Sequence, residues 1–189
     1  MENVTINKSI HLSEHLASPS EAALSRLSEL NGLRLSPHFT LGEVTKSRHE
    51  GIYNIPSHVA IENLKRVCSW LEELRFTYNS LYCLKPGEDY ETSENVEQIV
   101  INSGFRSPEL NKKVGGSPTS NHLTGCAVDI RVYGIEQAMR YAVILMDYAD
   151  ETTQDYDELL IEQNRSGRYW VHFAVRPKDN RRKTRFIMT

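Results

Sequence analysis

The side chains best suited to bind a metal ion or to catalyse a reaction lie in one short stretch, residues 120–129, where a histidine and an aspartate stand seven positions apart. In a helix this spacing is about two turns and would put the side chains of His122 and Asp129 roughly 10 Å apart, too far for one metal ion. The residues around Gly125 favour a loop instead, and residues 126–132 follow a strand-like alternation. A loop that turns at Gly125 and enters a strand can bring His122 and Asp129 back to a common point.

An imidazole and a carboxylate suit a borderline ion such as zinc, which takes about four ligands. A third protein ligand must then come from elsewhere, and the best candidate is His172 in the short apolar stretch 169–174. Alone, His172 would be read as a core histidine with satisfied ring nitrogens, but beside the first pair it predicts a ligand. Three such ligands leave a fourth position open for water, as in catalytic rather than structural zinc sites.

Two motifs together resemble the zinc peptidases of the D-alanyl-D-alanine carboxypeptidase family, the M15 group, which includes phage endolysins and other peptidoglycan peptidases. They are the run Ser120-x-His122-x-x-Gly125-x-Ala127-x-Asp129 and the later pair Trp170-x-His172, with supporting matches at residues 36–43, 103–111 and 114–116. The similarity covers roughly residues 35–182. It implies one zinc ion on His122, Asp129 and His172, and hydrolysis of peptide bonds in bacterial peptidoglycan stems, by carboxypeptidase or endopeptidase action.

The resemblance also raises the question of the proton acceptor that such a site needs. Many relatives place a glutamate three positions before the last histidine ligand, where this chain has Tyr169. Other relatives, and the similar zinc site of the hedgehog signalling domain, carry it on the preceding hairpin strand, where Glu162 lies. We expect the hairpin to fold Glu162 back beside His172, more nearly opposite it than the weaker candidate Glu158.

Three further residues near the motif receive expected roles. Arg106 matches the family's arginine that binds a substrate carboxylate or carbonyl, a task suited to a planar fork of donors, and a structural ion pair is the alternative. Ser120 is expected to hydrogen-bond Asp129 or the substrate. Cys126 is expected to point with the core side of its strand, away from Asp129, and to serve packing.

The composition of the chain bounds its class. A length of 189 residues suits one domain, and a net charge of −3 argues against a general nucleic-acid binder. Three widely spread cysteines make no disulfide framework. The sequence shows no signal peptide and no apolar run that would span a membrane. We therefore expect a monomer that is cytoplasmic as synthesised, with release to the cell wall if the chain is a phage lysis enzyme.

Hydrophobic periodicity and capping residues predict an α+β fold, a small antiparallel sheet with helices packed on one face. An N-terminal arm and a short helix that starts at Ser18 fill residues 1–34, and the peptidase-like domain fills residues 35–189. We expect two short helices that start at Thr40 and Ser107, and two long helices over residues 57–78 and 135–148. The expected strands cover residues 98–102, 126–132, 158–162 and 169–174. Residues 80–97 are expected to form an inserted solvated loop or to rim the cleft.

Two other functional classes stay open at this point. A zinc-binding domain of the same fold that binds cell wall without cleaving would show the same ligands. A non-haem iron oxygenase also uses two histidines and a carboxylate, but it usually spaces the first pair as His-x-Asp on a jelly-roll strand. The basic run of residues 176–185 is read as a solvated face, with binding of anionic wall polymers as the alternative.

Overall fold

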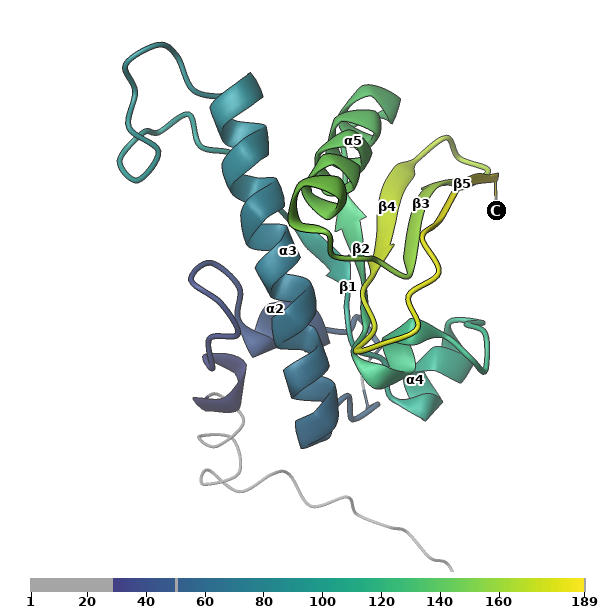
Figure 1. Ribbon diagram of the computed structural model, residues 1–189. Coiled ribbons are helices and arrows are strands. Elements are labelled where there is room, and N and C mark those ends of the chain that lie inside the picture. The colour runs from purple at the N-terminus through teal and green to yellow at the C-terminus, as the bar shows by residue number, and fades with distance from the viewer. Residues whose placement is uncertain (1–28, 50, 189) are drawn as a thin grey trace, which may run out of the picture.

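A five-stranded sheet with two long helices on one face forms the framework of the protein (Figure 1). The computed structural model describes residues 29–49 and 51–188. The strand order is β1-β2-β4-β3-β5, and all neighbours are antiparallel except the parallel pair β3 and β5. The bounds are β1 Ile101–Ser103, β2 Ala127–Arg131, β3 Glu158–Gln163, β4 Tyr169–Ala174 and β5 Lys183–Met188. The predicted α+β class is confirmed, with one parallel strand pair that the prediction did not include.

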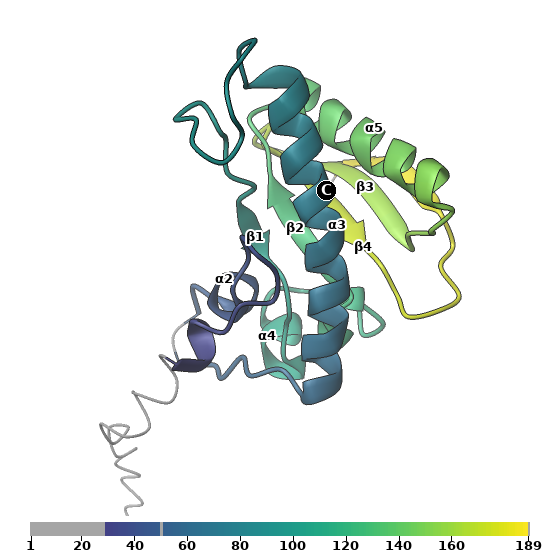
Figure 2. The same cartoon turned by 60° about the vertical axis from the view of Figure 1, so that its left-hand side comes forward.

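The two long helices, α3 (His58–Tyr82) and α5 (Ile135–Thr152), lie side by side across the sheet (Figures 1 and 2). The Ser57 side chain caps α3 by accepting a hydrogen bond from the Ala60 backbone N–H. Trp70 of α3 is almost fully buried, and its ring centroid lies 5.4 Å from that of Phe173 on β4. Burial of such aromatic area supplies a large share of the apolar free energy that holds helix and sheet together.

Strand alternation divides the sheet into an apolar face and a polar face. Phe173 and Leu159 belong to the core under the helices. Because neighbouring residues of a strand point to opposite faces, Asp129 and His172 lie on the face that α3 and α5 do not cover. The chemistry-bearing residues therefore project from the far side of a rigid, well-packed layer.

Three short helical elements surround one end of this polar face: α2 (Leu41–Thr45), α4 (Pro108–Lys113) and the 3₁₀ helix η1 (Asn121–Thr124). Thr40 and Glu43 form the predicted capping box of α2, and Ser107 caps α4 as expected. The Asn54 side chain joins these segments, because its amide donates to the Thr45 and Phe105 carbonyls while its oxygen accepts from the Ser107 N–H.

The structure departs from the sequence prediction mainly at element ends. The first strand covers residues 101–103 rather than 98–102, and both long helices run four residues further than predicted, α3 from 78 to 82 and α5 from 148 to 152. The basic run of residues 176–185, predicted to be a solvated face, overlaps the first half of β5, which continues to Met188. Residues 83–100 contain no helix or strand, in agreement with the expected loop, which protrudes from the end of α3 (Figure 1).

The predicted arm, residues 1–17, and most of the predicted first helix fall outside the described residues; residues 29–31 are helical and Gly32 forms a turn. Within residues 29–49 and 51–188, no helix has both the length and the apolar content needed to cross a membrane.

Candidate metal centre

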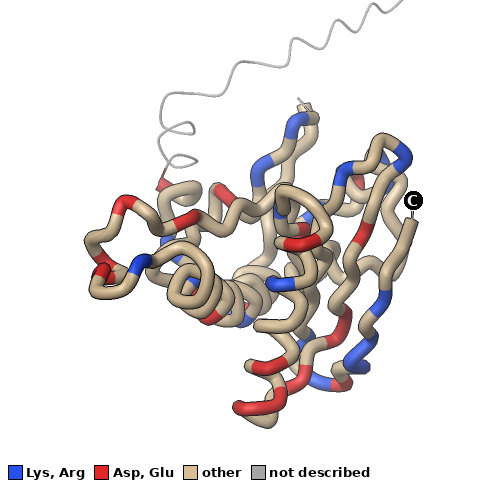
Figure 3. The backbone as a smooth tube through the Cα atoms, turned by 90° about the horizontal axis from the view of Figure 1, so that it is seen from above, with Lys and Arg blue, Asp and Glu red and all other residues tan. Residues whose placement is uncertain are grey.

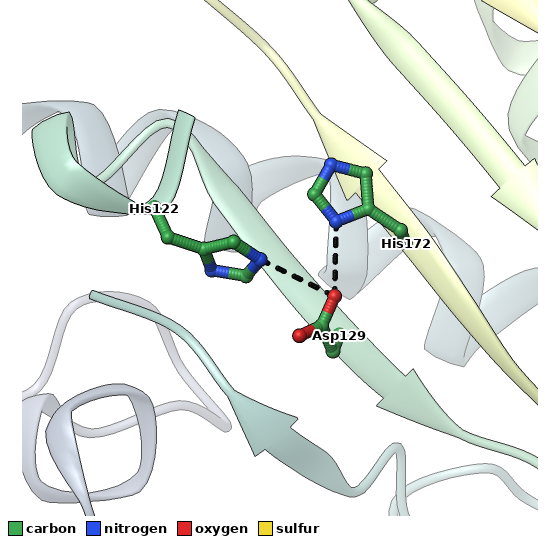
Figure 4. A group of neighbouring side chains, drawn as sticks. All are labelled: His122, Asp129 and His172. Atoms are coloured by element: carbon green, nitrogen blue, oxygen red, sulfur yellow. Dashed lines mark hydrogen bonds and ion pairs between the residues drawn. The ribbon is translucent and has the colours of Figure 1, made fainter. Parts of the chain in front are cut away.

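His122, Asp129 and His172 converge on the polar face of the sheet (Figure 4). Each offers one ligand atom, and the three atoms lie within 4.8 Å of one another. Asp129 Oδ1 is 3.3 Å from His122 Nε2 and 2.9 Å from His172 Nδ1. These distances confirm the sequence prediction that the three side chains meet. All three residues are buried.

The strand pairing fixes two of the three residues. Asp129 on β2 and His172 on β4 are direct partners in the antiparallel register. Directly opposed side chains in such a pair have Cβ atoms about 5 Å apart, which is the span that one ion can bridge.

His122 reaches the same point from η1, through the tight turn at Gly125. Gly125 has φ of 73°, and a Cβ atom built there would lie 2.4 Å from the Ala60 carbonyl oxygen of α3. The loop is also held by the Asn63 side chain, whose amide donates to the Thr124 carbonyl at 2.9 Å. Only glycine fits both the left-handed backbone and this close approach to α3.

The outer ring nitrogens of both histidines have defined neighbours. His122 Nδ1 lies 2.6 Å from the Gly104 carbonyl oxygen, an acceptor only, so Nδ1 carries a proton and Nε2 is the nitrogen that faces Asp129. His172 has its Nε2 3.7 Å from Glu158 Oε2, and its Nδ1 faces Asp129. Such outer contacts orient the ligating rings in metal sites.

The charges in the centre stabilise an ionised carboxylate. Burial alone would raise the pKa of Asp129, but the charges and hydrogen bonds of His122 and His172 outweigh it, so this pKa is well below its usual value. Burial lowers the pKa of His172, whereas the hydrogen bonds to Asp129 and Glu158 raise it, and the pKa rises to about 9. A cation placed between these groups would take over the role of the imidazolium proton.

The donor set fits a divalent metal ion. Two imidazole nitrogens and one carboxylate oxygen are borderline and hard donors of the kind that zinc and its neighbours accept, and both rings direct a nitrogen to the same Asp129 oxygen (Figure 4). Cys126 is buried but absent from this group, and its thiol lies 4.0 Å from the Thr124 carbonyl oxygen.

Arg106 contacts the centre from the side. Its guanidinium donates to Asp129 Oδ2 and, through Nε, to the Ser103 hydroxyl at 2.8 Å. Its backbone N–H also donates to the His122 carbonyl at 3.0 Å. The structural ion pair that the sequence analysis gave as the alternative role of Arg106 is thus present, with Asp129 as the partner. Substrate binding by Arg106 stays a prediction.

Ser120 supports the centre through the backbone. Its hydroxyl accepts from the His122 N–H at 3.3 Å and caps η1, rather than contacting the Asp129 side chain as one of its two expected roles required. Its second expected role, substrate binding, stays a prediction.

The register of the β3–β4 hairpin corrects one expectation. Leu160, not Glu162, lies directly opposite His172, while Glu158 pairs with Ala174 and Glu162 pairs with Trp170. Two-residue spacing keeps both acids on the same face as His172, one on either side of it. Position along the hairpin alone therefore does not separate the two candidate bases.

The surroundings of Glu158 neutralise it. Lys183 Nζ lies 2.7 Å and Arg181 lies 3.2 Å from Glu158 Oε1, and the Asn121 amide donates to Oε2 at 3.1 Å. The hydrogen bond with His172 is the largest influence on its pKa, and with Lys183 it lowers that pKa despite burial. Part of the basic run thus serves internal ion pairs rather than a free surface.

Glu162 lacks the charged partners that surround Glu158. It is half-buried, and its side chain makes no hydrogen bond or ion pair within residues 29–49 and 51–188. Burial raises the pKa of its carboxyl group, the charge on His172 acts in the opposite direction, and that of Asp129 adds to the rise. An unpaired carboxylate with a raised pKa beside the three candidate metal ligands is suited to accept a proton.

Sequence reasoning missed the contacts made by the Gly104 carbonyl and by Glu158 to the two histidine rings. A backbone carbonyl leaves no residue-type signal. Alternation along the strand indicated that Glu158 shares a face with Glu162, but Lys183, which pairs with Glu158, lies on a strand that was not predicted, and Arg181 lies just before that strand.

The comparison with family models gives one match, to peptidase M15, over residues 90–156. The matched part includes Arg106, Ser120, His122 and Asp129, whereas His172 and both candidate glutamates lie after it. No curated protein matches the chain.

Proposed function

We propose that this chain, which contains an M15 peptidase domain, is a zinc-dependent peptidase that hydrolyses peptide bonds in the stems of bacterial peptidoglycan. One observation supports this function most directly. Two histidines and an aspartate converge within 4.8 Å beside Glu162, the one acid of the β3 pair that has no charged partner. A structural metal site would have no use for an unpaired, half-buried carboxylate.

His122 Nε2, Asp129 Oδ1 and His172 Nδ1 would hold one zinc ion. Bound zinc supplies Lewis-acid chemistry, activating a water molecule and polarising an amide carbonyl oxygen. Gly104 and Glu158 keep the two rings oriented for this task.

Glu162 acts as the general base. Its carboxylate accepts a proton from the attacking water and returns it to the amine nitrogen as the carbon–nitrogen bond breaks. The raised pKa of Glu162 matches a group that must both take and give a proton in one cycle. Glu158 is held ionised by Lys183 and Arg181, so it is a poor proton donor in the second half of that cycle.

Arg106 binds a carboxylate or carbonyl group of the substrate. It lines the large cleft beside the centre, and its planar fork of donors suits such a group. Ser120, whose hydroxyl accepts from the His122 N–H, would also bind the substrate. Residues 35–189 would form the peptidase domain, acting as a monomer and reaching its substrate after release to the cell wall.

Mass spectrometry of muropeptides digested with the zinc-loaded protein tests this function and identifies the bond. The expected result is the gain of one water per cleaved stem, with loss of terminal D-alanine or a cut within the stem. One bound zinc ion without any product would instead select the second candidate, a zinc-binding wall domain that does not cleave.

A further inference from the structure

A wide cleft beside the metal centre is lined by cations. Its volume is about 1110 Å³, and its walls come from the loop after α2, from β1 and β2, and from the β3–β4 turn. The basic residues that line it are Lys46, Arg48, Arg106, Arg131 and Arg168. None of the described residues on its walls is an aspartate or a glutamate.

Most of these cations have no internal counter-charge. Arg106 pairs with Asp129, but Arg48, Arg131 and Arg168 form no salt bridge within residues 29–49 and 51–188. Arg131 uses only Nε, which donates to Asn102 Oδ1 at 3.3 Å. Arg181 and Lys183, by contrast, form ion pairs with Glu158.

The strand register places Arg131 in line with the centre. Arg131 follows Asp129 by two residues on β2, on the same face, and pairs across the sheet with Trp170. It therefore lies roughly 7 Å further along the sheet, the length of about two extended peptide residues. Glu162, also paired with Trp170, belongs to this same row, so the cleft lies on the side of the centre that carries the unpaired base.

We propose that Arg131, with Arg48 and Arg168, binds a second carboxylate of the substrate, outside the cleaved bond. The inference rests on the proposed peptidase function and narrows its substrates to peptides that carry at least two carboxylates. Guanidinium groups suit carboxylates because their forked donors match both oxygens. The volume of the cleft accommodates several peptide residues, and Tyr133 and Trp170 offer it apolar surface for their aliphatic parts.

Figure 3 shows the charged positions along the described backbone, and it shows that the acidic residues of the loop between α3 and β1 lie on the segment that protrudes from the molecule. The chain therefore has a net charge of −3 although the cleft itself is lined by cations. Local fields of this kind raise the concentration of an anionic ligand near its site.

Binding of two matched tetrapeptides, which differ only in one glutamate or glutamine side chain two residues from the scissile bond, tests the proposal. Isothermal titration is performed on the full chain, both zinc-loaded and after chelation, at low salt. We expect the carboxylate peptide to bind about tenfold more tightly than the carboxamide peptide, as one charge-assisted contact predicts. Arg131→Gln combined with Arg168→Gln should abolish the difference, whereas Arg165→Gln, an exposed arginine of the same turn that does not line the cleft, should keep it.

Equal affinity of the parent for the two peptides would overturn the proposal, as would a preference that survives in the double variant. Tighter binding of an oligonucleotide of the same charge would overturn the assignment to a peptide. A carboxylate preference without hydrolysis of either peptide would leave the inference standing and refute the peptidase function. Hydrolysis of both peptides at equal rates and with equal affinities would support the peptidase function and refute the inference about the second carboxylate.

Discussion

Asp129 and His172 face each other as direct partners across β2 and β4, with Oδ1 and Nδ1 2.9 Å apart. This pair rests on the backbone of two central strands, so its geometry is set by the sheet rather than by a loop. His122 then needs only one well-defined turn to complete the set. We therefore expect the surrounding fold to survive substitution of any one of these three residues.

The first prediction follows from that arrangement. His122→Ala or His172→Ala is expected to lose the bound metal while the circular dichroism spectrum stays that of the parent, because each removes a donor from the polar face of the sheet. Metal analysis of the purified variants provides the measurement. His58→Ala, an exposed histidine at the start of α3, serves as the control and should keep full occupancy. Full occupancy in either ligand variant would remove that residue from the centre.

The second prediction separates the two candidate bases. Glu162→Gln keeps the shape of the side chain but cannot accept a proton, so turnover should fall by at least about a hundredfold with metal content unchanged. Steady-state kinetics on a stem peptide measures this loss.

Glu158→Gln is the matched comparison for Glu162. It weakens the contact to His172 Nε2, so it should reduce metal affinity while turnover of the fully loaded protein stays within a few-fold of the parent. A hundredfold loss in loaded Glu158→Gln, with loaded Glu162→Gln nearly normal, would reverse the assignment.

The third prediction concerns Arg106. Arg106 donates to Asp129 and lines the cleft, so Arg106→Lys should lower kcat/KM by about tenfold or more while one metal ion stays bound. Lysine keeps the charge but offers no second donor in the plane. Unchanged kinetics would return Arg106 to a purely structural role.

The fourth prediction is a pH dependence with a defined sign. The pKa of His172 is raised to about 9 in the metal-free protein, so a proton occupies the ring at neutral pH and competes with the metal. Lowering the pH must then weaken metal binding, by up to about tenfold per pH unit below about 9. Titration in buffers of different ionisation enthalpy should show release of about one proton per metal at pH 7. Binding without proton release would contradict the expected charge on His172.

The fifth prediction uses two glycines with the same backbone angle. Gly115 and Gly125 both have φ of 73°, but a Cβ atom at Gly115 meets nothing within 4 Å whereas one at Gly125 meets the Ala60 carbonyl oxygen at 2.4 Å. Gly115→Ala should cost about 1 kcal/mol of unfolding free energy through the backbone angle alone. Gly125→Ala should cost more than about 3 kcal/mol, because η1 must also move away from α3. Urea unfolding measures both, and equal costs would show that the turn can shift freely.

The sequence predicted those features that depend on local patterns. Alternation of apolar residues placed Leu159 and Ile161 in the core and left the acids of β3 on the polar face, and capping residues located the starts of α2, α3 and α4. The three candidate ligands were predicted because their residue types and spacing within two motifs indicate metal binding directly.

Other features depend on contacts between distant segments and have no local signal. β5 joins β3 in parallel. Lys183 of β5 pairs with Glu158, and Arg181, just before β5, pairs with Asp157, although in the sequence both belong to what reads as a solvated charge run. The hairpin register was misjudged because the distance of Glu162 from the turn does not fix which residue faces His172; the backbone pairing fixes Leu160 there.

The cation-lined cleft could have been anticipated in part. Arg131 shares a face with Asp129 by simple alternation, so its presence near the centre follows from the same pattern that located the ligand. Its lack of a carboxylate partner, and its neighbourhood with Arg48 and Arg168, depend on how three separate segments meet.

Titration of the chelated protein with zinc, while hydrolysis of a peptidoglycan stem peptide is followed, tests the central claim most directly. Activity should rise in proportion to added zinc, reach its plateau at one ion per chain, and be absent at every zinc concentration in His172→Ala. Stoichiometric zinc binding without hydrolysis, or hydrolysis by the metal-free protein, would contradict a peptidase built on His122, Asp129 and His172.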